Sequence, residues 1–425
     1  MTFNIKTLGC KVNSYESEFI YGLFIEKGFS YCEEKADVYV VNTCTVTNMA
    51  DRKSRQIINS IRRDNPNSII AVCGCFSQNC YNTGKLDSIN ADIVIGNKDK
   101  SKIVDYVLEY SKNKEKIERF YDLKGASFEN MEITGSYDRT RAYVKIEDGC
   151  NSFCSYCVIP FTRGSVRSKN HESVIEEVIS LVNNGYKEIV LTGIHTGKYN
   201  DGEYDFADLV KDLVKVKGLK RLRVSSIEIN ELNDRVLEVF KESDVFVPHL
   251  HIPLQSGSDK VLQLMNRRYD KAFFEERISY IRSIKKDLSI TTDVIVGFPG
   301  ETDEMHKESM DFIKKIAFTK VHVFPYSDRE GTVASKFKEK VNGLIKKERV
   351  KELLLISENL EKDFYSKYVG KEMEVLFEEN KEGYSIGHTA NFIKVKTKEE
   401  HKSNEMCKML LNEENIELSN WQVVK

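Results

Sequence analysis

Three cysteines at C-x3-C-x2-C spacing form the segment of this sequence best suited to chemistry. Cys150, Cys154 and Cys157 lie close together, and the next cysteine downstream is Cys407. Cysteine thiolates hold iron–sulfur clusters, and a 4Fe–4S cluster normally takes four of them. Three close ligands without a nearby fourth predict a cluster with one iron left open for chemistry.

Two other interpretations of this segment are weaker. Structural zinc sites usually close with four ligands, typically as two separated pairs, and no matching second pair is present here. Free cysteines also behave as small hydrophobic residues in protein cores. However, Gly149, Asn151, Ser152 and Ser155 make this segment a polar loop and not a core strand.

A second group of three cysteines is spread over the first part of the chain. Cys10, Cys44 and Cys75 each follow a short segment that reads as a strand. In open parallel sheets, ligands bind in the crevice at the carboxyl edge of the strands. We therefore expect these three thiols to converge. Cys73 continues an apolar run and is interpreted as a core residue, and the isolated Cys32, Cys80 and Cys407 are interpreted as structural.

Residues 1–96 must position this second group. Strands are predicted at 3–8, 37–41, 68–72 and 92–95, with helices at 14–27 and 50–63 between them. Alternation of strand and helix favours a parallel sheet with helices on its faces. The prediction is an α/β domain.

Residues 139–342 repeat the rhythm of a strand followed by a helix six times. The predicted strands are 142–146, 188–191, 222–225, 249–252, 290–296 and 320–324. Six such units predict a partial parallel (β/α)6 barrel, with active residues at the carboxyl ends of its strands. The loop of Cys150 follows the first of these strands.

Other strand ends carry residues that suit a bound ligand. Each could also be an ordinary turn, but glycine allows the backbone to approach a ligand closely. The candidates are Thr192, Gly193, Glu228, Gln255, Gly297 and Gly300. Arg163 and Arg167 have two interpretations, contact with an anionic substrate through their guanidinium forks or internally paired charge.

The remaining segments are simpler. Residues 97–138 are predicted to be a linker, 343–366 a charged amphipathic helix, and 367–425 a small β-barrel of short alternating strands. The chain has 425 residues, a net charge of −2 and ten cysteines. No apolar run approaches the ~20 residues that span a bilayer. We expect a cytoplasmic protein in a reducing compartment, without a membrane partner.

The cysteine loop, with Tyr156 just before its last cysteine, resembles the signature of radical S-adenosylmethionine (SAM) enzymes. The sequences around Cys10, Cys44 and Cys75, and the stretch 157–168, resemble those of the methylthiotransferases within that group. The resemblance implies two 4Fe–4S clusters, each held by three cysteines, and SAM as both methyl donor and radical source. Tyr156 and the strand-end residues would cradle SAM. The C-terminal segment resembles the RNA-binding TRAM domain.

The residues after the first two cysteines resemble one branch of that family, the MtaB type. They are Cys10-Lys11-Val12-Asn13 and the run from Cys44 to Arg55. This implies methylthiolation of carbon 2 of the adenine in N6-threonylcarbamoyladenosine, next to the anticodon of a tRNA partner, with no role for DNA. The sulfur source and the electron donor stay open.

Two alternatives to this function remain. One is the same chemistry on N6-isopentenyladenosine in tRNA or on an aspartate of a ribosomal protein. The other is an iron–sulfur scaffold or electron carrier, for which four protein ligands per cluster are expected.

Overall fold

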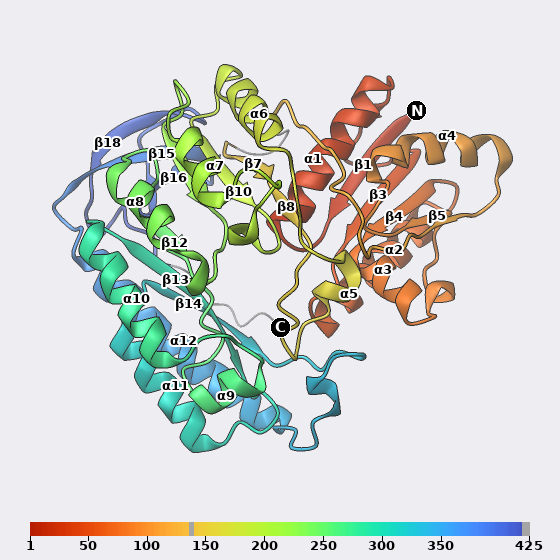
Figure 1. Cartoon of the computed structure of the whole chain (residues 1–425). Helices are drawn as coiled ribbons and strands as arrows, with labels where there is room; N and C mark the ends of the chain where they lie inside the picture. The colour runs from red at the N-terminus through yellow and green to blue at the C-terminus, as the bar shows by residue number, and fades with distance from the viewer. Residues whose placement is uncertain (136–139, 419–425) are drawn as a thin grey trace.

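A parallel sheet of six strands, in the order β2-β1-β3-β4-β5-β6, builds the N-terminal domain (Figure 1). The computed structural model describes residues 1–135 and 140–418. Every residue of β3 and β4 is buried, which is why their runs of β-branched residues form central strands. The domain contains strands β1 (Thr2–Thr7), β2 (Ser30–Tyr31), β3 (Val38–Thr43), β4 (Ile69–Gly74) and β5 (Ile93–Ile95), and helices α1 (Lys11–Glu26), α2 (Asn48–Asp64) and α3 (Cys75–Asn82).

The sequence predicts that residues 97–138 are a linker, and this is wrong for the first part of the segment. Its first part forms helix α4 (Ile103–Asn113) and strand β6 (Ile117–Arg119), and β6 pairs with β5 at the edge of the sheet. Apolar residues of α4 pack into the core beneath the sheet. The short length of β6 and the polar residues around it hide this continuation from a pattern search.

The central domain is an open arc of six parallel strands, as predicted. It comprises two sheets of three strands, β11-β10-β7 and β12-β13-β14, joined where Ile227 N donates to His251 O at 3.1 Å. The strands are β7 (Ala142–Lys145), β10 (Glu188–Thr192), β11 (Arg221–Val224), β12 (His249–His251), β13 (Ser289–Val296) and β14 (Lys320–Pro325). The two-residue strands β8 (Glu147–Asp148) and β9 (Arg167–Ser168) pair beside the arc.

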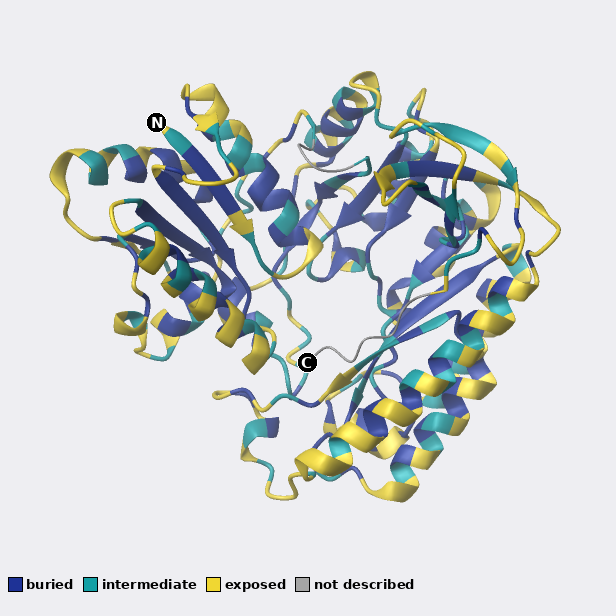
Figure 2. Ribbon diagram, turned by 180° about the vertical axis from the view of Figure 1, so that it is seen from behind, coloured by how far each residue is buried: buried dark blue, intermediate teal, exposed yellow. Residues whose placement is uncertain are grey.

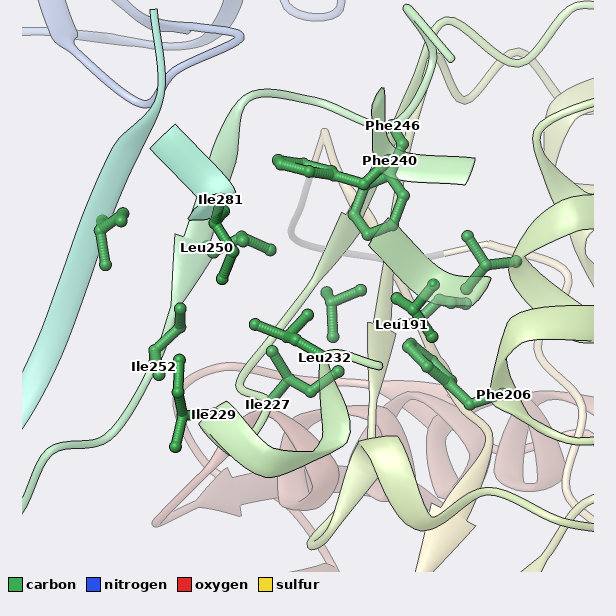
Figure 3. Close-up of a cluster of buried hydrophobic side chains, with 14 of the residues drawn as sticks. Leu191, Phe206, Ile227, Ile229, Leu232, Phe240, Phe246, Leu250, Ile252 and Ile281 are labelled. Carbon is green, nitrogen blue, oxygen red and sulfur yellow. The ribbon is translucent and has the colours of Figure 1, made fainter. Parts of the chain in front are cut away.

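Helices cover the outer face of the arc. Their apolar sides and the strands form one buried core, part of which is shown in Figure 3 around Leu191, Phe240 and Leu250. The larger helices are α6 (His171–Asn183), α7 (Phe206–Leu213), α8 (Asp234–Glu242), α10 (Lys271–Ile284) and α11 (Asp303–Ile316), and the short ones are α5 (Ile159–Arg163) and α9 (Asp259–Leu264).

Helix α12 (Gly343–Ser366) leads from the arc to a small antiparallel sheet of order β17-β16-β15-β18. Its strands are β15 (Glu372–Lys381), β16 (Tyr384–Thr389), β17 (Lys394–Thr397) and β18 (Met406–Leu410). The described strands form an open sheet, and pairing that would close the predicted barrel is not seen in them. The last residues of the predicted barrel, 419–425, lie outside the described residues, although Ile416 bridges to Val395. Strand β18 was not predicted.

Arginines of the arc hold the C-terminal sheet against the barrel strands. The Arg221 guanidinium donates to His388 O at 2.9 Å and to Glu374 O at 2.8 Å, and Arg141 pairs with Glu378 at 3.0 Å. Figure 2 shows buried strands in both large domains and exposed outer faces on α10 and α12. Across the described residues, every helix is too short or too polar to cross a membrane.

Candidate functional site

One cavity of about 460 Å³ brings together the two groups of cysteines. It lies at the carboxyl ends of the strands of both large domains. Six thiols line it, from Cys10, Cys44, Cys75, Cys150, Cys154 and Cys157. From the sequence we expect the cysteines within each group to lie close together. The structure in addition brings the two groups to one cavity.

The N-terminal group depends on three adjacent strands. Cys10 caps α1 after β1, Cys44 follows β3, and Cys75 opens α3 after β4. The turn at Gly74 requires glycine, because φ is +104° and a Cβ would lie 2.6 Å from the carbonyl oxygen of Thr43. Cys73, with no exposed surface, points into the apolar core, as expected.

The surroundings of this group suit metal-bound thiolates. Arg163 Nε lies 3.2 Å from the sulfur of Cys75, and Asn97 Nδ2 lies 3.4 Å from the same sulfur. Donors of this kind stabilise a negatively charged sulfur. Burial raises the pKa of the free Cys44 thiol to about 12, so a bound metal would have to displace its proton.

The loop group has its own hydrogen-bond donors. Ser152 N lies 3.4 Å from the sulfur of Cys150, Ile159 N lies 3.5 Å from that of Cys157, and Arg267 Nη1 lies 3.2 Å from that of Cys154. Each sulfur is thereby oriented by a separate polar contact. The donors and the three thiols together fit a cluster held on this loop.

Four of the predicted SAM contacts line the same cavity, and three do not. Tyr156, Gly193, Glu228 and Gln255 lie in its wall. Gln255 adopts a left-handed backbone with φ of 66°, where the chain crosses from β12 toward α9. These four positions keep their predicted role as contacts for a ligand beside the loop cysteines.

Thr192, Gly297 and Gly300 lie elsewhere. Thr192 is buried and lines a neighbouring cavity. A Cβ on Gly297 would lie 2.1 Å from Cγ of Lys346 on α12, so close packing accounts for this glycine. Gly300 donates its N–H to Glu339 O at 2.8 Å. These three residues do not line the cavity of the cysteines, and their contact with SAM stays a prediction.

Two residues without a predicted role lie against the loop cysteines. His195 Nδ1 is 3.6 Å from the sulfur of Cys150, and its other ring nitrogen contacts the carboxylate of Glu231. Burial opposes the charged imidazolium, but these two contacts outweigh it and raise the pKa of His195 to about 10. Arg267 also pairs with Glu228 at 3.0 Å. A lone histidine and a lone arginine carry no sequence pattern that would have found them.

Arg163 and Arg167 are internally paired. Arg163 is completely buried, and its Nη1 lies 3.0 Å from carboxylate oxygens of both Glu16 and Asp148. Arg167 Nη2 lies 3.0 Å from Asp148. The geometry therefore favours the second of the two interpretations and not contact with an anionic substrate.

These ion pairs join the two large domains. Glu16 lies on α1, and it also contacts Lys145 of β7 at 2.9 Å and Lys100 at 3.4 Å. Glu16, Lys100 and Arg163 have no exposed side-chain surface. The buried network fixes the N-terminal domain to the arc directly behind the cavity, so it sets the relative position of the two cysteine groups.

Two family models match the chain. The model described as the Radical SAM superfamily matches residues 144–313, and the model described as "Uncharacterized protein family UPF0004" matches residues 2–96. The arc, the three-cysteine loop and the matched model define a radical SAM protein with an additional N-terminal α/β domain that carries the second group of three cysteines.

Curated relatives extend over nearly the whole chain. It is 44% identical over 406 residues to "Threonylcarbamoyladenosine tRNA methylthiotransferase MtaB" of Bacillus subtilis (strain 168), covering 93% of this chain and 90% of the relative. The protein of that name from Aquifex aeolicus (strain VF5) is 39% identical, covering 90% and 94%. "tRNA-2-methylthio-N(6)-dimethylallyladenosine synthase" of Bacillus cereus (strain B4264) is 35% identical, covering 88% and 75%. The chain belongs to the methylthiotransferase family of radical SAM enzymes.

A solved structure supports the fold. The radical S-adenosylmethionine methyltransferase TsrM of Kitasatospora setae aligns with a TM-score of 0.55 at 13% identity, covering 76% of this chain and 74% of its own. The methylthiotransferase family uses SAM and two 4Fe–4S clusters. Two groups of three thiols around one cavity, each with polar donors to sulfur, fit that requirement.

Proposed function

We propose that the chain transfers a methylthio group to carbon 2 of the adenine in N6-threonylcarbamoyladenosine, next to the anticodon of tRNA. The observation that carries the proposal is the convergence of both cysteine groups on one cavity, in a chain 44% identical to a relative named for this reaction. A single cavity allows sulfur and radical chemistry to meet at one substrate atom.

In this proposal, Cys10, Cys44 and Cys75 hold one cluster and Cys150, Cys154 and Cys157 hold the other. When bound, the two clusters supply an iron for the sulfur that is inserted and the electron that cleaves SAM to the radical which activates the substrate carbon. The protein supplies binding, orientation and exclusion of water.

Several residues would orient these groups. Arg163 and Asn97 donate to the sulfur of Cys75, and Arg267 donates to that of Cys154. Glu228 and Gln255 offer polar atoms in the cavity wall to the amino, carboxylate and ribose groups of SAM. Apolar wall residues such as Val158 and Ile295 would exclude water from the reacting atoms.

Mass spectrometry of tRNA nucleosides from a deletion strain tests the function. We expect loss of the methylthio derivative of N6-threonylcarbamoyladenosine, restored by the wild-type chain but not by Cys157→Ala. Undiminished product would refute the proposal. Loss of the methylthio derivative of N6-isopentenyladenosine instead would assign the activity named for the Bacillus cereus relative.

The rival interpretation as an iron–sulfur scaffold is tested with purified protein. Anaerobically reconstituted enzyme with a reductant and SAM should release 5′-deoxyadenosine. Failure to do so with both clusters intact would favour the scaffold.

A further inference from the structure

A second cavity, of about 980 Å³, adjoins the cysteine cavity. Cys10, Gly193, Ser226 and Asp293 line both of them. The second cavity is bounded by the start of α1, the inner side of the arc and the C-terminal sheet. A group that occupies it therefore lies beside the N-terminal cysteine group.

More basic than acidic side chains line this second cavity, although the whole chain carries a net charge of −2. Five lysines and arginines face three carboxylates, an excess of two positive charges. Four histidines add further donors. The cations are Lys11, Arg141, Arg223, Lys320 and Lys394, the carboxylates are Asp293, Glu379 and Glu417, and the histidines are His249, His251, His322 and His388.

Local ion pairs account for several of these charges. Arg141 pairs with Glu378 at 3.0 Å, Lys394 pairs with Glu417 at 2.9 Å, and His251 Nε2 lies 3.2 Å from Asp293. Two of the three cavity carboxylates are thus paired with side chains of the same wall, and Arg141 is neutralised by a carboxylate outside it.

Two cations retain the capacity to bind an anion. Lys11, the first residue of α1, is exposed to the cavity and makes neither a hydrogen bond nor an ion pair with any part of the chain that the structure describes. Arg223 is only 3% exposed, and its Nη1 has no hydrogen-bond partner within the described ranges. The N-terminus of α1 adds a favourable partial charge beside Lys11.

Aromatic packing holds Arg223 in place. Its guanidinium lies over the ring of Phe392 at 4.7 Å from the centroid, and its Nε lies 2.8 Å from Glu188. Burial and the charge of Arg223 hold the pKa of His249 well below its usual range, so this ring is a neutral hydrogen-bonding group. The anchored guanidinium of Arg223 and the ammonium of Lys11 thus line the same cavity, and each has a donor available to an anion.

We propose that Lys11 and Arg223 bind the carboxylate of the threonylcarbamoyl group of the substrate adenosine in this second cavity. This inference rests on the proposed function, and it adds how the enzyme would distinguish N6-threonylcarbamoyladenosine from N6-isopentenyladenosine. A threonylcarbamoyl group ends in a carboxylate, whereas an isopentenyl group is uncharged. The carboxylate would accept from the ammonium of Lys11 and from the free Nη1 of Arg223, whereas an isopentenyl group offers these donors no acceptor, so this pair favours the charged substrate.

The test is a binding experiment with reconstituted full-length protein and synthetic anticodon stem–loops, read by fluorescence anisotropy. One RNA carries N6-threonylcarbamoyladenosine and the other carries its methyl ester, so that only the negative charge differs. We expect wild type to bind the acid about tenfold more tightly than the ester, as a charge-assisted hydrogen bond provides.

Lys11→Met should abolish this difference while leaving affinity for the ester within about twofold, and Lys11→Arg should retain most of it. Lys6→Met is the matched control, because Lys6 is an exposed lysine on β1 that lines neither cavity. It should leave the preference intact.

Three results would overturn the inference. The first is that wild-type protein binds both RNAs equally, and the second is that the Lys11→Met variant keeps the preference for the acid. The third is that Lys11→Met lowers the affinity for the acid and for the ester equally, which would assign Lys11 to an RNA phosphate. The two proposals can fail separately. If the binding preference depends on Lys11 but the deletion strain keeps its tRNA methylthio product, the anion site is supported and only the proposed reaction is refuted.

Discussion

Replacing Glu16 with glutamine tests whether the buried charge network holds the two large domains together. Glu16 has no exposed surface and contacts Lys145 at 2.9 Å, Arg163 at 3.0 Å and Lys100 at 3.4 Å. Burial opposes its charge, but these three cations outweigh burial and lower the pKa of Glu16 well below its usual range. Glutamine keeps the shape and removes the charge.

The magnitude follows from what remains around residue 16. Removing one partner of a buried ion pair costs about 3–5 kcal/mol, because the other charge is left uncompensated. Glutamine retains a carbonyl oxygen that still accepts one hydrogen bond, and Asp148 continues to neutralise Lys145 and Arg163. We therefore expect the lower end of that range, about 3 kcal/mol.

Urea unfolding of the metal-free protein, followed by circular dichroism, measures this loss. Glu26→Gln is the matched control, because Glu26 is an exposed glutamate at the end of the same helix. A Lys100→Met variant should also lose stability, and the double variant should lose less than the sum, with a coupling of at least about 1 kcal/mol. A loss below about 1 kcal/mol for Glu16→Gln, the value of an exposed pair, would refute the reasoning.

Three further predictions concern cluster binding and stability. Cys75→Ala should remove the iron of about one cluster, whereas Cys73→Ala should retain it, and iron and sulfide analysis measures both. Equal loss of iron in the two variants would contradict the assignment of Cys73 to the apolar core. Gly149→Ala should destabilise the fold by more than about 2 kcal/mol in urea, because its φ is +87° and a Cβ would lie 2.1 Å from a backbone carbonyl oxygen. The control Gly202→Ala, with φ of +106° and nothing within 4 Å, has the strain without the clash and should cost less. Glu188→Gln should cost about 1–3 kcal/mol at neutral pH. Despite burial, three arginines lower the pKa of Glu188 in the folded state, so its contribution is present above the unfolded pKa of about 4.3 and is lost as pH falls through the folded value. Urea titrations at several pH values should show the difference shrinking below about pH 4, and a difference independent of pH would refute this assignment.

The backbone of both large domains could be predicted because buried parallel strands have a strong pattern. The strands at 38–43 and 69–74 each begin with four consecutive apolar residues, and their boundaries differ from the predicted ones by a few residues at most. Parallel strands end at a common edge, so the convergence of Cys10, Cys44 and Cys75 follows from the topology. The edge strands β6 and β18 have only three and five residues, and they were missed.

The ion pairs behind the site could not be predicted from the sequence. A charged residue is normally exposed, so Glu16 on a helix and Lys145 on a strand give no indication that they meet. Their burial depends on how two domains pack, a property that no local pattern carries. The same packing explains why Arg163, a candidate substrate contact in the sequence, forms buried ion pairs between the two domains.

Whole-chain charge is similarly uninformative about where this protein binds an anion. The net charge of −2 suggests no affinity for RNA, yet the second cavity is lined by the ammonium of Lys11 and by a guanidinium nitrogen of Arg223 that has no hydrogen-bond partner within the described residues. A few charges inside a cavity act across a lower dielectric than charges on the outer surface, so their effect on a bound ligand is larger. Lys11 follows Cys10 directly in the chain, and the turn that places a thiol in one cavity therefore also places an ammonium group in the next. This adjacency gives a physical reason why the residue after the first cysteine should influence the choice of substrate.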